Sequence, residues 1–342
     1  MVRYQCVRPS SQPEGPPDRV RVAPRPVSDG SPIERRMTDC TPTFEGGALY
    51  DPREDAIPLA DLVRSATDTI GTRRADGSGV PFGFEELDAL LGGGLAPGTL
   101  TVVASRPSMG TSTLLMDLCR NAAIRHRTPT MLAGYQSPHH ELILRLVSAE
   151  TRVPLDRLRA GTLDDDEWAR VTRRMTEAAG APLFIVTPTD WTVVDLSARA
   201  ADLAAVEDVR LMVVDGLHDI RSTRPGEPGD RLVTEAARAL KELAMQLEMP
   251  VVVGAQLNRN PECRIDRRPG PLTDLRYSDA VGHIADLVVM VHREDAYDPD
   301  STRAGEADLI VAKHRDGPRA TVTVSVEPRF ARFVDPRVPL LH

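Results

Sequence analysis

The chain has 342 residues, of which 41% are hydrophobic and 27% are charged, and its formal net charge is −8. Its apolar runs, such as Leu287–Val291, are far shorter than the roughly 20 residues of a membrane-spanning helix, which argues against a transmembrane protein and against a membrane partner. The negative balance argues against a protein that coats nucleic acid over its whole surface, but it is compatible with a local basic channel.

The first 56 residues have the composition of a segment that does not fold alone. They carry nine prolines, mixed charges and little apolar clustering, so they cannot bury enough surface to offset the entropy of folding. They also contain no apolar stretch of the signal-peptide type. We therefore expect residues 1–56 to be a disordered head and the protein to be cytoplasmic.

After Pro58 the pattern changes to that of a short amphipathic helix. Apolar side chains recur at helical spacing and share one face, namely Leu59, Leu62, Val63, Ala66 and Ile70. A Gly/Ser break follows at residues 77–79, so we expect residues 57–79 to form a linker. An isolated helix of this kind must dock its apolar face, either on its own domain or on a neighbouring subunit.

From residue 80 onward, short β-branched apolar runs alternate with helical patterns such as Arg231–Glu248. The expected strands are Leu100–Ala104, Thr130–Ala133, Leu183–Val186, Leu211–Val214, Val251–Ala255 and Leu287–Val291, with closing strands at Leu309–Lys313 and Thr321–Val326. Nearly continuous apolar strands suit a sheet that is buried on both faces. We therefore predict an α/β domain with a doubly wound, mostly parallel sheet at residues 80–336, followed by a short tail at 337–342. Ligands are expected at the carboxyl ends of the strands.

The run Leu100–Ala104 is followed by the frame of a phosphate-binding loop. In such a loop, backbone N–H groups at a strand-to-helix turn hold phosphate oxygens, a lysine reaches the β- and γ-phosphates, and the next Ser or Thr holds Mg²⁺. The frame comprises Ser105, Arg106, Pro107, Ser108, Met109, Gly110, Thr111, Ser112 and Thr113. The glycine and the metal-binding hydroxyl of Ser112 are present, but a threonine occupies the lysine position.

Several motifs occur in the order and spacing of one known family. "RPSMG" at residues 106–110 and "AKHRDGP" at 312–318 are the most specific, whereas "LLGGGL" at 90–95 is shared more widely. Over roughly residues 57–336 the chain resembles the RecA-like motor domain of the DnaB-type replicative helicases. The resemblance implies a RecA-like P-loop fold, ATP and Mg²⁺ as cofactors, single-stranded DNA as a partner, and a homo-oligomeric, hexameric ring. In place of the family's N-terminal collar domain, we expect only the disordered head.

Two positions that the resemblance assigns to hydrolysis depart from the family. Thr111 replaces the lysine, and Gln136 stands where the family has the glutamate that activates the attacking water. An amide cannot accept that proton. Loss of a positioned cation beside a transferring phosphoryl group typically costs a factor of roughly 10²–10³ in rate. Because both substitutions affect the same hydrolysis reaction, they predict weakened or absent ATP turnover. Nucleotide binding by the backbone N–H groups should be retained.

Two strand ends carry polar residues that fit the same site. Asp215 follows the run Leu211–Val214, where a carboxylate can hold Mg²⁺ together with Ser112. Taken alone, an aspartate at a strand end is more often a helix cap or a turn former. Gln256 follows the run Val251–Ala255 and resembles the family's polar sensor of the γ-phosphate. Without the resemblance, it reads equally well as a polar residue at the start of a loop.

A pair of cations lies near the end of the strand predicted at Leu309–Lys313. Lys313 and Arg315 are two residues apart and therefore on the same side. They resemble the family's finger residues, which reach the nucleotide of the neighbouring subunit; the alternative is a solvated strand end. This chain keeps Lys313 and Arg315 although Thr111 replaces the lysine of its own loop. The pair could therefore serve a neighbouring subunit with an intact site, such as a helicase paralogue.

A loop at residues 258–271 carries four arginines and two acids, a net charge of +2. Loops in this region face the central channel in the family and contact single-stranded phosphates. The candidate DNA-binding residues are Arg259, Arg264, Arg267, Arg268 and Arg276. We expect the loop to lie outside the sheet, so that Arg267 and Arg268 are dispensable for folding. Tyr277 and Asp279 depart from the family pattern, and a surface loop without a ligand is the alternative.

Two functions from different classes fit these observations. The first is a working, slow ATP-dependent DNA helicase of DNA replication. The second is a pseudo-ATPase that binds nucleotide or DNA and acts as a regulatory or structural partner. The residues that separate them are Thr111 and Gln136, because a helicase needs turnover and a pseudo-ATPase does not.

Overall fold

The structure, a computed structural model, describes Leu59 and residues 79–224, 228–276 and 279–337. The head expected at residues 1–56, most of the expected linker and the tail beyond residue 337 lie outside the described residues. Leu59, the one described residue of the expected amphipathic helix, is helical and exposed. The chain divides into two compact units, Met1–Ser65 and Ala66–His342, and the fold below belongs to the second.

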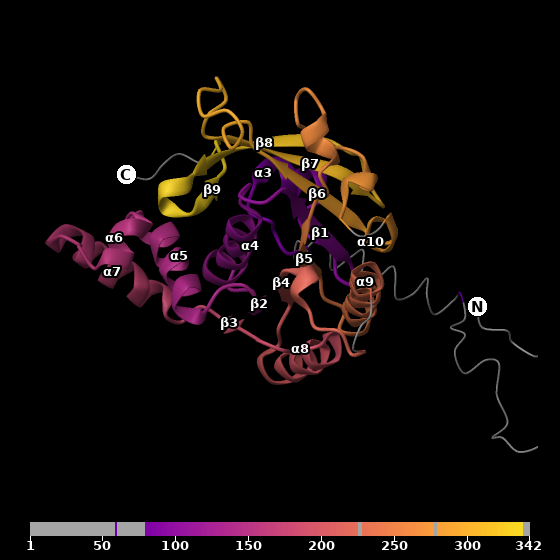
Figure 1. Cartoon of the computed structure of the whole chain (residues 1–342). Coiled ribbons are helices and arrows are strands. Elements are labelled where there is room, and N and C mark those ends of the chain that lie inside the picture. Colours follow the sequence, from indigo (N-terminus) through magenta and orange to yellow (C-terminus); the bar gives the residue numbers. More distant parts are fainter. Residues whose placement is uncertain (1–58, 60–78, 225–227, 277–278, 338–342) are drawn as a thin grey trace, which may run out of the picture. The chain divides into compact units, whose positions relative to one another are not determined.

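One mixed sheet runs through this unit (Figure 1). Its strands are β1 (Leu100–Ser105), β2 (Thr130–Gly134), β3 (Leu183–Val186), β4 (Leu211–Asp215), β5 (Val251–Gln256), β6 (Leu287–His292), β7 (Glu306–His314), β8 (Thr321–Glu327) and β9 (Arg332–Val334). Their order is β3-β2-β4-β5-β1-β6-β7-β8-β9. Pairing is parallel from β3 to β6 and antiparallel from β6 to β9.

All the strands expected from the sequence are present, and β9 is an additional one. Several extend one residue further than expected, so that Ser105, Asp215 and Gln256 are the last residues of β1, β4 and β5. These three strands are neighbours in the parallel part of the sheet. Their carboxyl ends therefore meet at one edge, where ligands bind in sheets of this type.

The described helices cover both faces of the sheet. They are α3 (Glu85–Leu90), α4 (Thr111–Arg120), α5 (His139–Thr151), α6 (Leu155–Ala160), α7 (Asp165–Ala178), α8 (Val193–Glu207), α9 (Gly229–Gln246) and α10 (Asp279–Ile284). Helix α9 matches the periodic segment expected at Arg231–Glu248. None of the described helices is long and apolar enough to cross a membrane.

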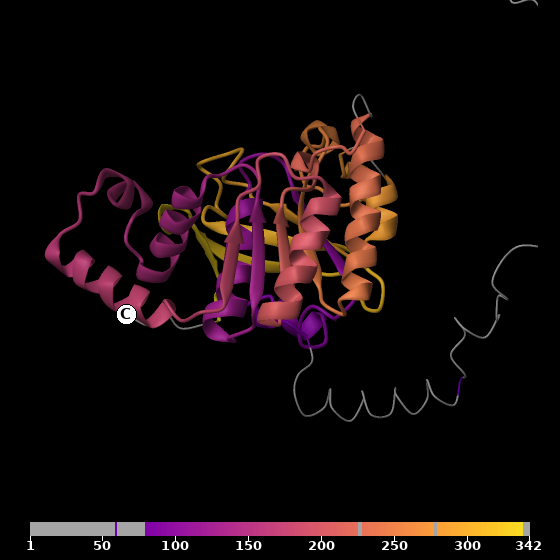
Figure 2. The same ribbon diagram turned by 90° about the horizontal axis from the view of Figure 1, so that it is seen from below.

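Two hydrophobic cores lie on opposite faces of the sheet because successive strand side chains alternate. In β1, Val102 belongs to the core under α8 and α9, whereas Val103 belongs to the core under α3 and α4. Figure 2 shows α8 and α9 side by side across one face of the parallel strands. This arrangement confirms the expected α/β fold with a doubly wound, mostly parallel sheet.

Helices α5, α6 and α7 pack on one another and project beside α4 (Figures 1 and 2). Their attachment includes a buried carboxylate, Glu150, near the end of α5. It accepts hydrogen bonds from Arg120 of α4 and from Arg174 of α7, both at 2.7 Å. A buried charge is tolerated only when it is paired in this way, so the ionic cluster fixes how the projection sits on α4.

Candidate functional site

The expected phosphate-binding loop is a strand-to-helix turn. β1 ends at Ser105, α4 begins at Thr111, and Ser108 (φ 68°) and Gly110 (φ 102°) adopt the left-handed conformation between them. A Cβ on Gly110 would lie 2.9 Å from the ring of Phe333, so a glycine is required for space as well as for backbone geometry. The turn thus presents the first N–H groups of α4, a ten-residue helix, at the carboxyl end of β1.

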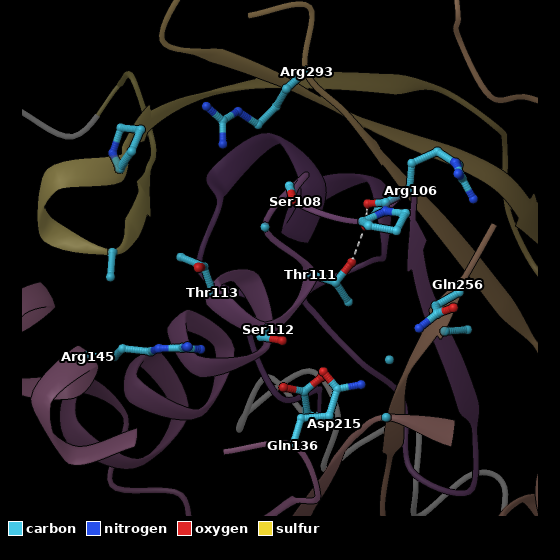
Figure 3. A pocket seen from close by; sticks show the side chains of 18 of the residues that line it. Arg106, Ser108, Thr111, Ser112, Thr113, Gln136, Arg145, Asp215, Gln256 and Arg293 are labelled. Atoms are coloured by element: carbon cyan, nitrogen blue, oxygen red, sulfur yellow. Dashed lines mark hydrogen bonds between the residues drawn. The ribbon is translucent and has the colours of Figure 1, made fainter. Parts of the chain in front are cut away.

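A cleft of about 470 Å³ opens at this turn. Eight of the nine residues predicted for the loop line it, whereas Met109 is buried. The other walls come from the ends of β4 and β5 and from α5, as the labelled residues of Figure 3 show. The cleft therefore combines the elements that the sequence analysis assigned to one nucleotide site.

Thr111, at the position of the missing lysine, holds its hydroxyl in a local hydrogen bond. Its Oγ1 lies 2.5 Å from the Oγ of Ser105 (dashed in Figure 3). The side chain is too short to extend far into the cleft and carries no charge. Phosphate binding at this turn would therefore rely on backbone N–H groups and on cations from other elements.

Ser112 and Asp215 form the pair expected for a metal ion. The Asp215 carboxyl group accepts a hydrogen bond from the Ser112 hydroxyl. Burial raises the pKa of Asp215, and the Ser112 hydrogen bond and the charge of Arg145 oppose the rise only in part. A mostly buried carboxylate beside a hydroxyl is a set of hard oxygen donors that suits Mg²⁺, so the residues fit the ion that the loop implies.

Gln136 lies just after β2, which pairs with β4 in register, so that Gly134 stands opposite Asp215. Its amide Nε2 donates a hydrogen bond of 2.8 Å to Oδ2 of Asp219. Asp219 ends the short 3₁₀ turn η2 (Leu217–Asp219) that follows β4, and it also lines the cleft. No local pattern in the sequence marks Asp219 as a functional residue.

Gln256, the expected sensor, ends β5 and lines the cleft. Its Oε1 accepts a hydrogen bond of 2.6 Å from the Arg276 guanidinium, and the backbone N–H of Arg276 donates to the Gln256 carbonyl at 2.9 Å. The structure thus joins the expected sensor to one of the candidate DNA-binding residues. Arg276 is not a free surface cation.

Four arginines line the cleft, and they differ in how they are held. Arg106 is paired with Glu262, Arg159 with Glu141, and Arg293 with Asp295. Arg145, the fourth, points into the cleft from α5 (Figure 3).

No ion pair to Arg145 is found within the residues that the structure describes. Because the other three arginines of the cleft are paired with acids, Arg145 is the candidate to supply the charge that position 111 lacks. Nothing in the sequence marks it, because an arginine on the polar side of a helix is ordinary.

Lys313 and Arg315 are not among the residues that line the cleft. Lys313 Nζ donates to the carbonyls of Gly282, His283 and Ala285 at the end of α10, at 2.7–2.9 Å. Arg315 pairs with Asp286 at 2.6 Å. A cation at a helix C-terminus stabilises that helix, so both side chains have local structural partners. A finger role would involve the site of another subunit.

The loop at residues 258–271 lies outside the sheet, as expected, but two of its arginine side chains are paired with buried carboxylates. Arg264 makes two hydrogen bonds of 2.7 Å to Asp274, which is fully buried. Arg268 is paired with Asp308 of β7, which is also buried. Arg268 is therefore anchored to β7, so we expect its replacement to lower stability instead of leaving the fold unaffected.

Arg259 and Arg267 remain as exposed cations of the loop. The Arg267 guanidinium stacks 4.9 Å from the ring centroid of Tyr297, a cation–π contact that leaves its charge at the surface. Tyr277 and the side chain of Asp279, which depart from the family pattern, lie outside the described part of the chain.

The chain is similar in sequence to proteins of known family. A profile of the "DnaB-like helicase C terminal domain" family matches residues 79–335. A replicative DNA helicase DnaB of Leifsonia xyli subsp. xyli (strain CTCB07) is 43% identical over 285 residues, covering 82% of this chain and 62% of that protein. One of Mycobacterium leprae (strain TN) is 42% identical over 224 residues, covering 66% of this chain and 37% of that protein. The chain thus spans less than two thirds of these relatives.

Solved structures show the same fold. One solved ATPase domain superposes with a TM-score of 0.76 at 25% identity, covering 82% of this chain and 99% of that domain. A DnaB-like replicative helicase, described with its interactions with primase, gives a TM-score of 0.73 at 24% identity, covering 82% of this chain and 67% of that one. The RecA-like fold expected from the motifs is confirmed.

Proposed function

Because the chain belongs to the DnaB-like helicase C-terminal domain family, we propose that it is a replicative motor domain that binds ATP with Mg²⁺ and single-stranded DNA as part of a hexameric ring. Hydrolysis is weakened in this proposal. The observation that carries it is the strand-to-helix turn at Ser105–Thr111, which lines a cleft together with Asp215 and Gln256 but has no cation at position 111.

Nucleotide binding in this proposal depends on the backbone. The N–H groups at the start of α4 attract phosphate oxygens through the helix dipole. Ser112 and Asp215 would hold Mg²⁺, which when bound neutralises charge on the β- and γ-phosphates. Arg145 supplies a positive charge from the opposite wall of the cleft. These contacts need no lysine at position 111.

Slow hydrolysis follows from the two substitutions. Thr111 offers a hydroxyl that is already bonded to Ser105, so it contributes no charge to a transferring phosphoryl group. Gln136 cannot accept a proton.

The same observations support the second candidate, a pseudo-ATPase that binds nucleotide and DNA and acts as a regulatory partner. The two candidate functions differ in one measurable property, the rate of ATP hydrolysis.

DNA and ring contacts are inferred from family membership and from exposed charge. The loop at residues 258–271, called the channel loop below, has Arg259 and Arg267 as its exposed cations, and Arg264 and Arg268 hold its shape. Arg276 follows this loop and is bonded to Gln256. Lys313 and Arg315 would reach the nucleotide of the next subunit, or that of a paralogue with an intact site. A cytoplasmic location fits this role.

Titration with a fluorescent ATP analogue, with and without Mg²⁺, tests nucleotide binding in the full chain. We expect Mg²⁺-dependent binding that Ser112→Ala weakens. We also expect Arg145→Ala to lower affinity about tenfold or more, because a charge-assisted hydrogen bond is worth roughly 1.5–3 kcal/mol. Arg199→Ala, which removes an exposed arginine of α8, is the control and should leave affinity unchanged. If the wild-type chain binds no nucleotide at millimolar concentration, the proposed function is wrong.

A further inference from the structure

Two carboxylates line the cleft among the residues that the structure describes. Asp215 is bonded to Ser112, where the metal ion is expected. Asp219 is the other, and it is half-buried beside Gln136. Hydrolysis of a phosphoanhydride by water needs a group that orients the water and takes its proton. Within the described lining, Asp219 is the carboxylate left for that task.

We propose that Asp219 is the proton acceptor of the residual ATP hydrolysis and that Gln136 holds its carboxylate in place. This inference rests on the proposed function, since it requires ATP in the cleft. A water oxygen would attack the γ-phosphorus, and the bond from that phosphorus to the β,γ-bridging oxygen would break. Its electron pair stays on ADP, and the proton of the water passes to Asp219 and then to solvent.

The hydrogen bond from Gln136 supports this assignment. The amide must present its N–H to the carboxylate, because the opposite orientation would place two acceptor oxygens at 2.8 Å from each other. A carboxylate has two acceptor oxygens, and the Gln136 N–H engages Oδ2, so the other oxygen can accept the proton. The bond also limits rotation of Asp219, and a positioned base is more effective than a mobile one.

The topology explains why these two residues meet. Gln136 follows β2 and Asp219 follows β4, and these strands are neighbours in the parallel sheet. Both residues therefore emerge at the same edge although they are 83 positions apart. Asp219, after β4, would then accept the proton that Gln136, after β2, cannot accept.

The proposed role of Asp219 predicts how a glutamate at position 136 would behave. Replacing Gln136 with Glu would put two carboxylates at hydrogen-bond distance, and such a pair shares one proton instead of ionising twice. Gln136→Glu alone should therefore change turnover by less than about tenfold. In a variant that carries Asp219→Asn, however, Gln136→Glu should restore turnover. The double variant again has one carboxylate at this place, now supplied by position 136 instead of position 219.

Phosphate release from Mg²⁺-ATP tests this in full-length protein that carries Thr111→Lys, so that turnover is raised into a measurable range. Asp219→Asn should lower the rate by a factor of about 10² or more. Gln136→Glu combined with Asp219→Asn should return it to within about tenfold of the parent. Asp208→Asn, an exposed carboxylate after α8, is the matched control and should not change it. Binding of the fluorescent ATP analogue should stay within about threefold for all variants, which separates a chemical role from a structural one.

An unchanged rate in Asp219→Asn overturns the inference, and so does a parent that binds nucleotide but shows no turnover. A loss that appears with His218→Gln and not with Asp219→Asn would assign the proton to the histidine that also lines the cleft, and it overturns the inference too. Absence of nucleotide binding in every variant would instead reject the proposed function itself.

Discussion

In the proposed function, the side chain at position 111 affects turnover but not nucleotide binding. The backbone turn that holds phosphates depends on Gly110 and on the helix that follows, and both are intact. The charge that stabilises a transferring phosphoryl group depends on the side chain, and here it is a threonine bonded to Ser105. Binding and hydrolysis therefore rest on different atoms of the same loop.

Thr111→Lys should raise the rate of phosphate release by a factor of roughly 10² or more, because it restores a cation beside the transferring group. A coupled phosphate-release assay with saturating Mg²⁺-ATP measures this. Thr172→Lys, which adds the same charge on the exposed side of α7, is the control and should leave the rate at the wild-type level. A wild-type rate equal to that of Thr111→Lys would show that the lysine is dispensable here.

At the scale of the elements, the loop after β5 is a rigid extension of the sheet. Asp308 of β7 receives hydrogen bonds from Arg268, Arg303 and Thr323. Burial opposes ionisation of Asp308, but these hydrogen bonds outweigh it and hold its pKa well below the usual range. The loop is thereby anchored to the strand whose far end carries Lys313.

Adjacent arginines in this loop should respond differently to replacement. Arg268→Ala should lower the free energy of unfolding by about 1–3 kcal/mol, because it removes one partner of a buried carboxylate. Arg267→Ala should leave stability nearly unchanged but reduce the slope of log K against log salt for single-stranded DNA by about 0.7. Urea unfolding and DNA titrations at several salt concentrations measure the two effects.

The pH dependence provides a check on the same anchor. The pKa of Asp308 is depressed in the folded state, so its contribution to stability is complete above the unfolded value of about 3.9 and is lost as pH falls toward the folded value. The stability difference between wild type and Arg268→Ala should therefore shrink below about pH 4. Equal stability of both single variants at neutral pH would contradict this account of the loop.

For the whole molecule, the proposed binding to single-stranded DNA has to occur despite a net charge of −8. The channel loop provides a local positive charge, because its arginines outnumber its acids and two of the arginines are exposed. Assembly would concentrate such loops around one axis. The amphipathic segment at residues 59–70 is the sequence feature best suited to hold neighbouring subunits together.

Deletion of residues 57–72 should lower the oligomeric state. Burial of four or five apolar side chains on a neighbour would contribute several kcal/mol, at about 1.5–3 kcal/mol for each large one. Light scattering across a concentration series measures the mass. Deletion of residues 21–36, which removes the same length from the head, is the control and should preserve the mass. An unchanged mass after deletion of 57–72 would mean that the segment packs on its own domain.

The sequence by itself determined the strands, the phosphate-binding turn and the convergence of Ser105, Asp215 and Gln256, since hydrophobic period and turn chemistry are local properties. The carboxyl ends of adjacent parallel strands then meet by geometry alone. The strands and the turn needed no knowledge of long-range contacts, whereas the adjacency of β4, β5 and β1 is a property of the assembled sheet.

Only the tertiary structure decided which polar side chains pair across the fold. Gln136 and Asp219 are 83 residues apart, and Arg268 and Asp308 are 40 apart. Their contacts depend on strand order and on how each loop returns to the sheet, which local patterns do not specify. A single arginine or aspartate looks the same in sequence whether it is exposed to a ligand or bonded to a buried partner, because burial and pairing arise only when distant segments pack together.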